Sequence, residues 1–282
     1  MPARSRSSAP DTARAPSDYV EYAPSEALRP FVVCFWTREA TGARAAAPGQ
    51  VHRILPDGCI DIVLEFNGPA DEPESAMVVG TMTKALVLDA TASPECFVGV
   101  RFRPGKAAAF LNLPASEVTD LRLSLDDVWR DAPDVREAMA ASSTAIARVR
   151  ALERVLLSRL TAEADATGRD IDEAVRRIID AGGSLGITRL APSLGVTRQH
   201  LARRFSQLVG VSPKTFARIV RLSRVVERVR AVPPSESVNW SMLALELGYY
   251  DQSHLVDEFR EMTGVSPAAW RESKRAAQAP DG

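Results

Sequence analysis

Residues that could bind the edges of bases are concentrated between positions 198 and 203. Arginine suits the O6 and N7 atoms of guanine, and glutamine suits N6 and N7 of adenine, each good contact giving about 1–3 kcal/mol of discrimination. The candidate base-reading residues are Arg198, Gln199, Ala202 and Arg203. The apolar residues at helical spacing among and after them are Leu201, Phe205 and Leu208. This pattern predicts an amphipathic helix whose exposed face carries the candidate readers.

The charge of the chain is unevenly distributed. The whole sequence has a formal net charge of −1. Residues 182–232 hold ten basic residues against one acidic residue, whereas residues 233–275 carry a charge of −3 and residues 1–181 a charge of −6. A block of +9 on an otherwise acidic chain favours a polyanionic partner.

The group of candidate readers belongs to an internal repeat. Arg198–Phe216 and Gln252–Trp270 align without gaps, and seven of their nineteen positions are identical. The identical pairs are His200/His254, Leu201/Leu255, Phe205/Phe259, Gly210/Gly264, Val211/Val265, Ser212/Ser266 and Pro213/Pro267. Because there are only two copies, a paired module is favoured over a repeat array.

Each copy predicts a helix-turn-helix. In the first copy, Gly195 supplies the left-handed residue that ends one helix, and Thr197 is a good N-cap for the next. Gly248 and Asp251 have the same roles in the second copy. The segment 213–231 between the copies has no internal Gly or Pro, so it predicts a helix of about 28 Å. Successive major grooves of B-DNA are about 34 Å apart, so one rigid helix would hold the copies near adjacent grooves.

The second copy departs from a simple basic reader. Its candidate base-reading residues are Gln252, Ser253 and His254. Asp257 and Glu258 occupy the positions of two arginines in the first copy. Carboxylates accept hydrogen bonds from cytosine N4 but repel phosphate, so we expect this copy to read weakly or mainly to dock. A lone histidine more often packs against other side chains or caps a helix than binds a ligand or a base. A purely structural role for His254 is therefore left open.

Phosphate contacts are expected from polar residues near helix starts, whose backbone N–H groups also attract anions. The candidates are Thr197, Ser212, Lys214, Arg218 and Ser266. Arg204 is expected to pair with the helix predicted over 213–231.

Residues 170–275 resemble the C-terminal domain of the AraC/XylS family of bacterial transcription regulators. The motifs that carry the resemblance are LAPSLGVTRQHLARRF, VGVSPKTFARI and LALELGYYDQSHLVDEFREMTGVSPAAWR. The resemblance implies a double helix-turn-helix that binds promoter DNA. It points to Gln199, Ala202 and Arg203 as base readers.

The first half of the chain predicts short strands separated by turns. Pro56-Asp57-Gly58 is a turn signal, and Cys59–Phe66 and Cys96–Arg103 alternate apolar and polar residues. The segments LPDGCIDIVLEF, VVG and VGVRFRPG are similar to an uncharacterised variety of β-rich N-terminal domain in AraC-type regulators, over about residues 18–130. That resemblance names no ligand.

Candidate ligand-binding residues in this half are Arg101, Arg103, Asp57 and Asp61. The arginines precede a Pro-Gly helix start and could hold an anion, or they could pair with the aspartates in a structural network, which is the favoured alternative. We find no Ser-His-Asp set, phosphate loop or metal pattern, so neither an enzyme nor a cofactor is expected. The three cysteines form no disulfide or zinc pattern, and a reducing cytoplasm is the simplest setting.

These observations predict an α+β chain with a mostly-β, barrel-like N-terminal domain and an all-α C-terminal domain. The expected divisions are a disordered tail over 1–17, a β-rich domain over 18–135, a helical connector over 136–168, the DNA-binding domain over 169–275 and a tail over 276–282. The apolar stripe in the helix expected over 134–160 fits intrachain packing and a dimer seam equally well. No apolar run has the length of a membrane helix.

The favoured function is a sequence-specific transcription regulator that acts in the cytoplasm, at the nucleoid. The sequence does not decide between an activator and a repressor. Its N-terminal domain would sense an unknown small molecule or make protein contacts, and coupling would run through residues 134–181. The expected partner is double-stranded promoter DNA, and the sequence leaves contact with RNA polymerase and a homodimer open. The alternatives are a DNA-binding protein with an enzymatic front domain of the DNA-repair type, or with a front domain that only dimerises or contacts the polymerase.

Overall fold

The computed structural model describes residues 19–39, 51–67, 73–89, 96–142, 144–161 and 168–278, so the tail predicted over 1–17 lies outside the described residues. The strands are β1 (Tyr19–Tyr22), β2 (Val32–Glu39), β3 (Val51–Ile54), β4 (Ile60–Phe66), β5 (Ser75–Val79), β6 (Leu86–Asp89), β7 (Cys96–Phe102) and β8 (Arg122–Ser124). The α-helices are α1 (Ala108–Leu111), α2 (Leu125–Val128), α3 (Ala132–Ala140), α4 (Ala145–Arg159), α5 (Arg169–Asp180), α6 (Ile187–Ser193), α7 (Arg198–Val209), α8 (Pro213–Ala231), α9 (Trp240–Glu246), α10 (Gln252–Thr263) and α11 (Pro267–Gln278). The 3-10 helices are η1 (Glu26–Leu28) and η3 (Ala115–Glu117).

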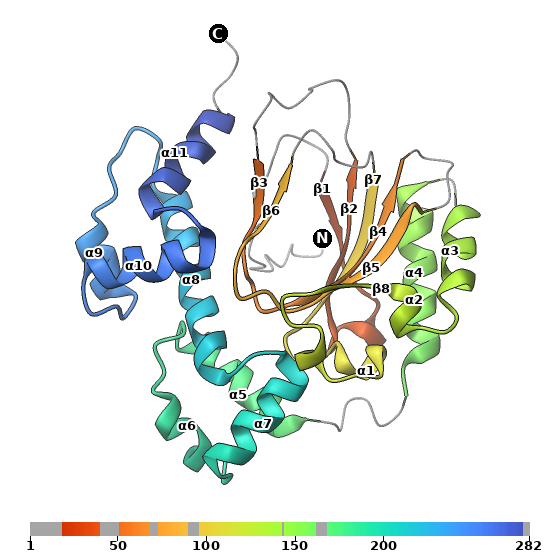
Figure 1. Ribbon diagram of the computed structural model, residues 1–282, viewed down its shortest axis with the longest axis horizontal. Helices are drawn as coiled ribbons and strands as arrows, with labels where there is room; N and C mark the ends of the chain where they lie inside the picture. Colours follow the sequence, from red (N-terminus) through yellow and green to blue (C-terminus); the bar gives the residue numbers. More distant parts are fainter. Residues whose placement is uncertain are drawn as a thin grey trace, which may run out of the picture.

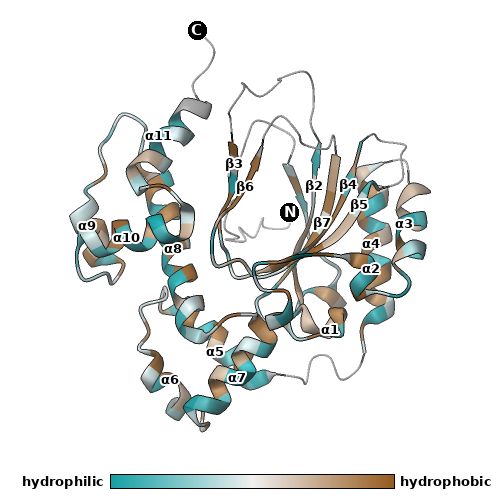
Figure 2. Ribbon diagram, viewed as in Figure 1, coloured by the Kyte–Doolittle hydropathy of each residue, from teal (hydrophilic) through white to brown (hydrophobic). Residues whose placement is uncertain are grey.

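Six strands form one antiparallel sheet in the order β1-β2-β7-β4-β5-β8, and β3 pairs with β6 in a separate two-stranded ribbon (Figure 1). The central strand β7 is buried along its whole length and is mostly brown in Figure 2. The α+β fold class with a β-rich first half is confirmed. Among the described residues the sheet is open rather than barrel-shaped, because β1 and β8 lie at opposite ends of the strand order.

Helices α3 and α4 cover one face of this sheet (Figure 1). Leu152 and Leu156 of α4 lie in one core with Val100 and Phe102 of β7. The stripe is therefore used for packing within the chain. The helix expected over 134–160 is divided in two, since α4 begins afresh where the Thr144 side chain accepts a hydrogen bond from the Ala147 amide. Helix α4, which falls within the connector predicted over 136–168, packs its apolar side chains in the core beneath the sheet.

Helices α5 to α11 form the second unit around their own core. Helix α8 spans residues 213–231, as the sequence predicts, and joins the two helix-turn-helix copies (Figure 1). Phe205 of α7 packs on Phe216 of α8 with ring centroids 5.6 Å apart, and Phe259 of α10 packs on Trp270 of α11 at 6.1 Å. The two copies therefore bury equivalent phenylalanines against the helix that follows each.

Candidate nucleic-acid interface

The two recognition helices, α7 and α10, are built by the same local devices. The Thr197 hydroxyl accepts a hydrogen bond from the His200 amide at 3.1 Å, and the Asp251 carboxylate accepts one from the His254 amide at 2.8 Å. Such side-chain caps satisfy backbone donors that a helix start leaves unpaired. The caps predicted from the sequence are present in both copies.

The candidate readers of the first copy lie together on the exposed side of α7. Arg198, Gln199, Ala202 and Arg203 are all exposed. Leu201, Phe205 and Val209 are buried on the opposite side, and Leu208 is partly buried. Because the buried face anchors the helix to the core, the N-terminal half of α7 presents guanidinium and amide groups to the outside.

The candidate readers of the second copy are exposed but partly engaged by the protein. Gln252 accepts a hydrogen bond from the Ser241 hydroxyl at 2.8 Å. The His254 Nδ1 atom accepts one from the Tyr250 amide at 3.4 Å. Ser253 is exposed as well. Two of the three candidate readers of α10 therefore already have a hydrogen-bond partner within the protein.

Glu258 of α10 joins this helix to α8. Its carboxylate is 6% exposed and accepts hydrogen bonds from Arg218 (2.9 Å) and from Arg221 (3.1 Å). Arg218 also donates to Glu261 at 2.6 Å, and this hydrogen bond lowers the pKa of the Glu261 carboxyl. Paired in this way, Glu258 cannot face a phosphate. The comparison of the two copies marks the position as different but gives no sign of this interhelical role.

The candidate phosphate-binding residues have different surroundings. The Ser212 and Ser266 hydroxyls cap helix starts, accepting from the Thr215 amide (3.1 Å) and the Ala269 amide (3.2 Å). Lys214 is exposed, and its ammonium group forms no ion pair with another residue of the described segment 168–278. The Arg218 guanidinium is already held by two glutamates.

Arg204 contacts a different helix from the one expected. Its guanidinium lies 4.0 Å from the carboxylate of Asp170 on α5, and the His200 imidazole lies 3.7 Å from the same carboxylate. The expected pairing with α8 is therefore wrong. The reason is that α5, which precedes the repeat, packs beside α7 in the tertiary structure and supplies the acid.

Three of the four candidate ligand residues of the N-terminal domain lie together, and Arg103 lies apart from them. Arg101 is 6% exposed and binds both oxygens of Asp61, at 3.2 and 3.1 Å, with Asp57 at 3.5 Å. Arg103 instead donates to the backbone carbonyl of Arg29 at 2.8 Å. Arg101 thus has the structural network that the sequence analysis favoured, although its Nη1 atom is buried without an acceptor among the described residues.

The two units meet at the C-terminal ends of both recognition helices. The buried Thr81 hydroxyl donates to the Val209 carbonyl, and the Thr119 hydroxyl donates to the Gly210 carbonyl, each at 2.6 Å. Gly210 has φ +93°, and a Cβ there would lie 3.0 Å from both threonine oxygens. The position accordingly requires glycine for its conformation and for close approach.

The segment after Thr81 reaches the second copy. The Ala85 amide donates to the Met262 carbonyl of α10 at 2.7 Å. Residues 81–85 therefore bond to the ends of α7 and α10 together. Lys106 and Asp172, 2.6 Å apart, add an ion pair between the units. No sequence pattern signals these contacts, because isolated threonines and a backbone amide have no distinctive spacing.

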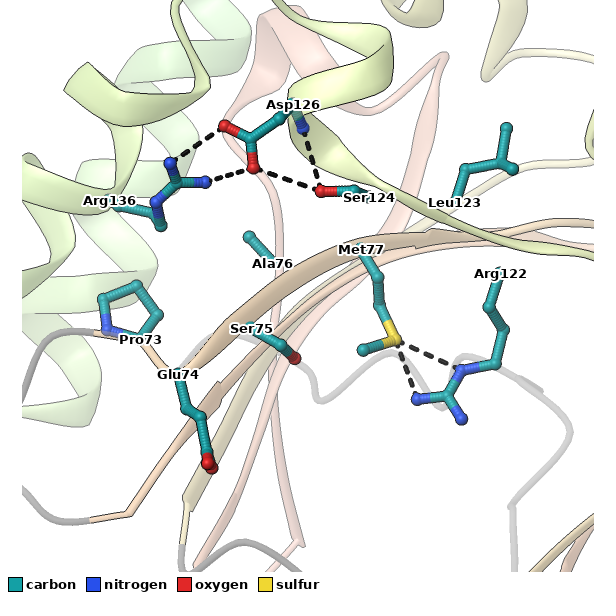
Figure 3. A pocket seen from close by; sticks show the side chains of 10 residues that line it. All are labelled: Pro73, Glu74, Ser75, Ala76, Met77, Arg122, Leu123, Ser124, Asp126 and Arg136. Carbon is teal, nitrogen blue, oxygen red and sulfur yellow. Dashed lines mark hydrogen bonds and ion pairs between the residues drawn. The ribbon is translucent and has the colours of Figure 1, made fainter.

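A surface hollow of about 520 Å³ lies beside β5, β8 and α2 (Figure 3). Arg136 binds Asp126 across it at 2.6 and 2.8 Å, and Arg122 reaches the Met77 sulfur at 2.9 Å. Both arginines that line the hollow therefore already have partners within the protein.

Within the described ranges, no group of three or more His, Cys, Asp or Glu residues could hold a metal ion. In the same part of the chain, no helix combines the length and apolar character that crossing a membrane requires.

Two known families match the chain, one in each of its two structural units. Residues 20–124 match a family described as "Domain of unknown function (DUF6597)", and residues 190–273 match one described as "Helix-turn-helix domain". No curated protein matches the chain in sequence.

The chain is also similar to solved structures of ToxT from Vibrio cholerae. The structure bound to (E)-4-(8-methylnaphthalen-1-yl)but-3-enoic acid is 12% identical, with 85% of this chain and 99% of that chain covered and a TM-score of 0.43. The unsaturated fatty acid-bound structure is 10% identical, with 78% and 93% covered and a TM-score of 0.40. By its two family matches, the chain joins an N-terminal domain of unknown function to a C-terminal helix-turn-helix domain of the AraC type.

Proposed function

We propose that the protein recognises a specific promoter sequence chiefly through α7. The observation that carries this proposal is the group of exposed residues on the N-terminal half of that helix, opposite its buried face. Arg198 and Arg203 are suited to guanine, and Gln199 to adenine, while Ala202 suits the methyl group of thymine.

Helix α10 is proposed to contact fewer base edges than α7 and chiefly to position the domain on the duplex. Ser253 is its exposed reader, and Gln252 and His254 add weaker contacts because each already has a partner within the protein. The exposed carboxylate of Asp257 repels the DNA phosphates. The ion pairs of Glu258 with Arg218 and Arg221 of α8 fix the angle of α10. A second helix held in this way would set the register of the first on the duplex.

Phosphate contacts are proposed for Lys214 and for the helix starts at Thr197, Ser212 and Ser266. Backbone N–H groups and the helix dipole favour an anion at each start. Arg218 remains a candidate, but a phosphate would have to compete with Glu258 and Glu261 for its guanidinium.

The N-terminal domain is proposed to sense a small molecule and to change the affinity for the operator. The support is its direct bonding to both recognition helices through residues 81–85, so that a change in the domain reaches both readers. The route is this contact rather than the chain segment 134–181 alone. A ligand acts only if it binds one domain arrangement better than the other. The buried, partly unsatisfied Arg101 beside Asp61 and Asp57 is the candidate polar anchor inside the domain.

The test is genome-wide selection of DNA fragments bound by the purified full-length protein at near-physiological salt. We expect one motif with two blocks about one helical turn apart, and stronger sequence preference in the block that α7 contacts. Binding that depends on salt but selects no motif would contradict sequence-specific recognition. A parallel selection with Arg154→Ala, an exposed arginine on α4, serves as the control for general loss of positive charge.

A further inference from the structure

An aromatic side chain stands in solvent directly before the second recognition helix. Tyr250 precedes the N-cap residue of α10 and is 86% exposed, more than any other large apolar residue of the part of the chain that the structure describes. Its hydroxyl group forms no hydrogen bond with another described residue. Single exposed apolar side chains are common on proteins, so the position of this ring matters more than its exposure.

The ring is an insertion in the second copy. Between the glycine that ends the first helix and the N-cap of the next, the first copy has one residue, Val196, and the second copy has two, Tyr249 and Tyr250. Val196 packs against the apolar core of this unit, and Tyr249 is 4% exposed within the same core. Because Tyr249 fills the packing role of Val196, Tyr250 is the additional residue and is not needed for the fold of the turn.

The backbone on both sides of the ring is held in place. The Tyr250 amide donates to the His254 Nδ1 atom at 3.4 Å, and the Asp251 carboxylate caps α10. The rings of Tyr249 and His254 meet edge to face, with centroids 5.3 Å apart. The turn therefore displays the Tyr250 ring at the N-terminal end of α10, and His254 positions it.

The N-terminal end of a recognition helix is the part that meets base edges in the major groove. The first turn of α10 has no arginine or lysine, unlike that of α7. What it offers instead is an apolar ring and an amide donor. The Gln252 Oε1 atom accepts from the Ser241 hydroxyl, and its Nε2 group has no partner among the described residues. Thymine matches this pair, since its edge in the major groove carries a methyl group on C5 and an acceptor at O4.

We propose that Tyr250 makes the second copy select a thymine, by packing its ring on the C5 methyl group while the Gln252 Nε2 group donates to O4. This inference rests on the proposed DNA recognition and names the base that α10 prefers. Cytosine at the same position lacks the methyl group and presents a donor at N4, so it matches neither contact. Burying one methyl group contributes about 0.8 kcal/mol, which is about fourfold in affinity.

The test repeats the genome-wide selection with full-length Tyr250→Ala beside the wild type. We expect the wild type to prefer a thymine at one position of the second block, and Tyr250→Ala to lose that preference while keeping the first block. Fluorescence anisotropy then compares a duplex with that thymine against one with deoxyuridine, which lacks only the methyl group. The wild type should lose about fourfold in affinity on the deoxyuridine duplex, and Tyr250→Ala should bind both duplexes equally.

Two variants and one duplex serve as controls. Tyr250→Phe keeps the ring and should retain the fourfold difference between the duplexes. Leu157→Ala, which shortens an exposed apolar side chain on α4, should behave as the wild type. Deoxyuridine in place of a thymine outside both blocks should leave every affinity unchanged.

The proposal is overturned if the wild type binds the thymine and deoxyuridine duplexes equally, or if Tyr250→Ala keeps the difference between them. Weak and equal binding of both duplexes by Tyr250→Phe would assign the contact to the hydroxyl group and a phosphate, and would overturn the proposal as well. A motif confined to the first block rejects thymine selection by Tyr250 alone. The absence of a motif in both blocks also rejects the proposed DNA recognition.

Discussion

The two helix-turn-helix copies share a fold but not a surface. Each has a side-chain cap, a left-handed glycine at the end of its recognition helix and a buried phenylalanine against the next helix. The residues on the outer faces of the two recognition helices mostly differ. Positions that carry Arg203 and Arg204 in the first copy carry Asp257 and Glu258 in the second. A duplicated scaffold thus tolerates divergence outside its apolar core: the first copy presents the exposed Arg203, whereas the second uses the buried Glu258 to attach to α8.

The largest effect is expected at the position where one copy has Glu258 and the other has Arg204. Glu258→Ala would leave two partly buried arginines without their shared carboxylate, and removing one member of a buried ion pair costs about 3 kcal/mol. Arg204→Ala breaks a looser pair 4.0 Å long and should cost less than about 1 kcal/mol. Urea unfolding of both variants measures the difference. Equal losses of unfolding free energy in the two variants would mean that strong attachment by an ion pair is not specific to the second copy.

The next effect concerns the readers. Arg203→Ala should reduce the preference for the selected site over a site altered at one base pair by roughly 5- to 150-fold, equivalent to about 1–3 kcal/mol. Asp257→Ala, at the matching position, should change affinity by less than about threefold and relax no base preference, since a carboxylate near the backbone contributes repulsion. Fluorescence anisotropy on matched and altered duplexes measures both. Loss of preference in Asp257→Ala instead would assign base reading to the second copy.

The caps should behave alike in the two copies. Thr197→Ala and Asp251→Ala each remove one side-chain acceptor at a helix start, with an expected loss of about 1 kcal/mol of unfolding free energy. The serine variants of both positions keep an acceptor and act as controls. A loss in one copy only would show that the copies differ in local helix stability as well as in surface chemistry.

A smaller effect concerns salt. Lys214→Ala should weaken binding to all sequences uniformly and reduce the slope of log affinity against log salt by about one, because one phosphate contact is lost. The matching position in the second copy is Ala268. Ala268→Lys should raise the slope by about one if that helix start also lies at the backbone. An unchanged slope in Ala268→Lys would place the second copy away from the DNA.

The smallest effect is a dependence on pH. The hydrogen bond from Arg218 lowers the pKa of Glu261 below its ordinary value of 4.5 in the folded state. Its contribution to stability is therefore present above that ordinary value and is lost as pH falls through the lower folded-state pKa. Glu261→Gln should thus lose less stability between neutral pH and pH about 3 than the wild type does, by a small amount because the carboxylate is mostly exposed. An identical pH profile would indicate that the ion pair is not maintained in solution.

Part of the interface could be predicted from the sequence because its signals are local. Thr197 and Asp251 are polar caps directly before apolar periodicity, and Gly210 follows directly after it. The uninterrupted stretch 213–231 predicts α8 with its observed bounds, since nothing inside it breaks a helix. The exposed position of Arg203 follows from the spacing of its apolar neighbours. Whether these residues bind bases stays a prediction.

The rest depended on residues far apart in the chain. The apolar stripe of α4 has no preferred partner until the sheet is present, and the carboxylate of Glu258 has no assigned role until α8 brings Arg218 and Arg221 to it. Thr81, more than a hundred residues before α7 ends, bonds to that end only because the two units pack together.

Local patterns in the sequence were enough to predict the two helix-turn-helix copies, their caps, the joining helix and the basic character of the first copy. These features arise from short-range preferences of the backbone and from helical periodicity, which act within a few residues. The acid that pairs with each arginine, and the bonding of residues 81–85 to both recognition helices, follow only from the packing in the tertiary structure. Those contacts depend on how two separately built cores pack, and that packing leaves no periodic mark in the order of the residues.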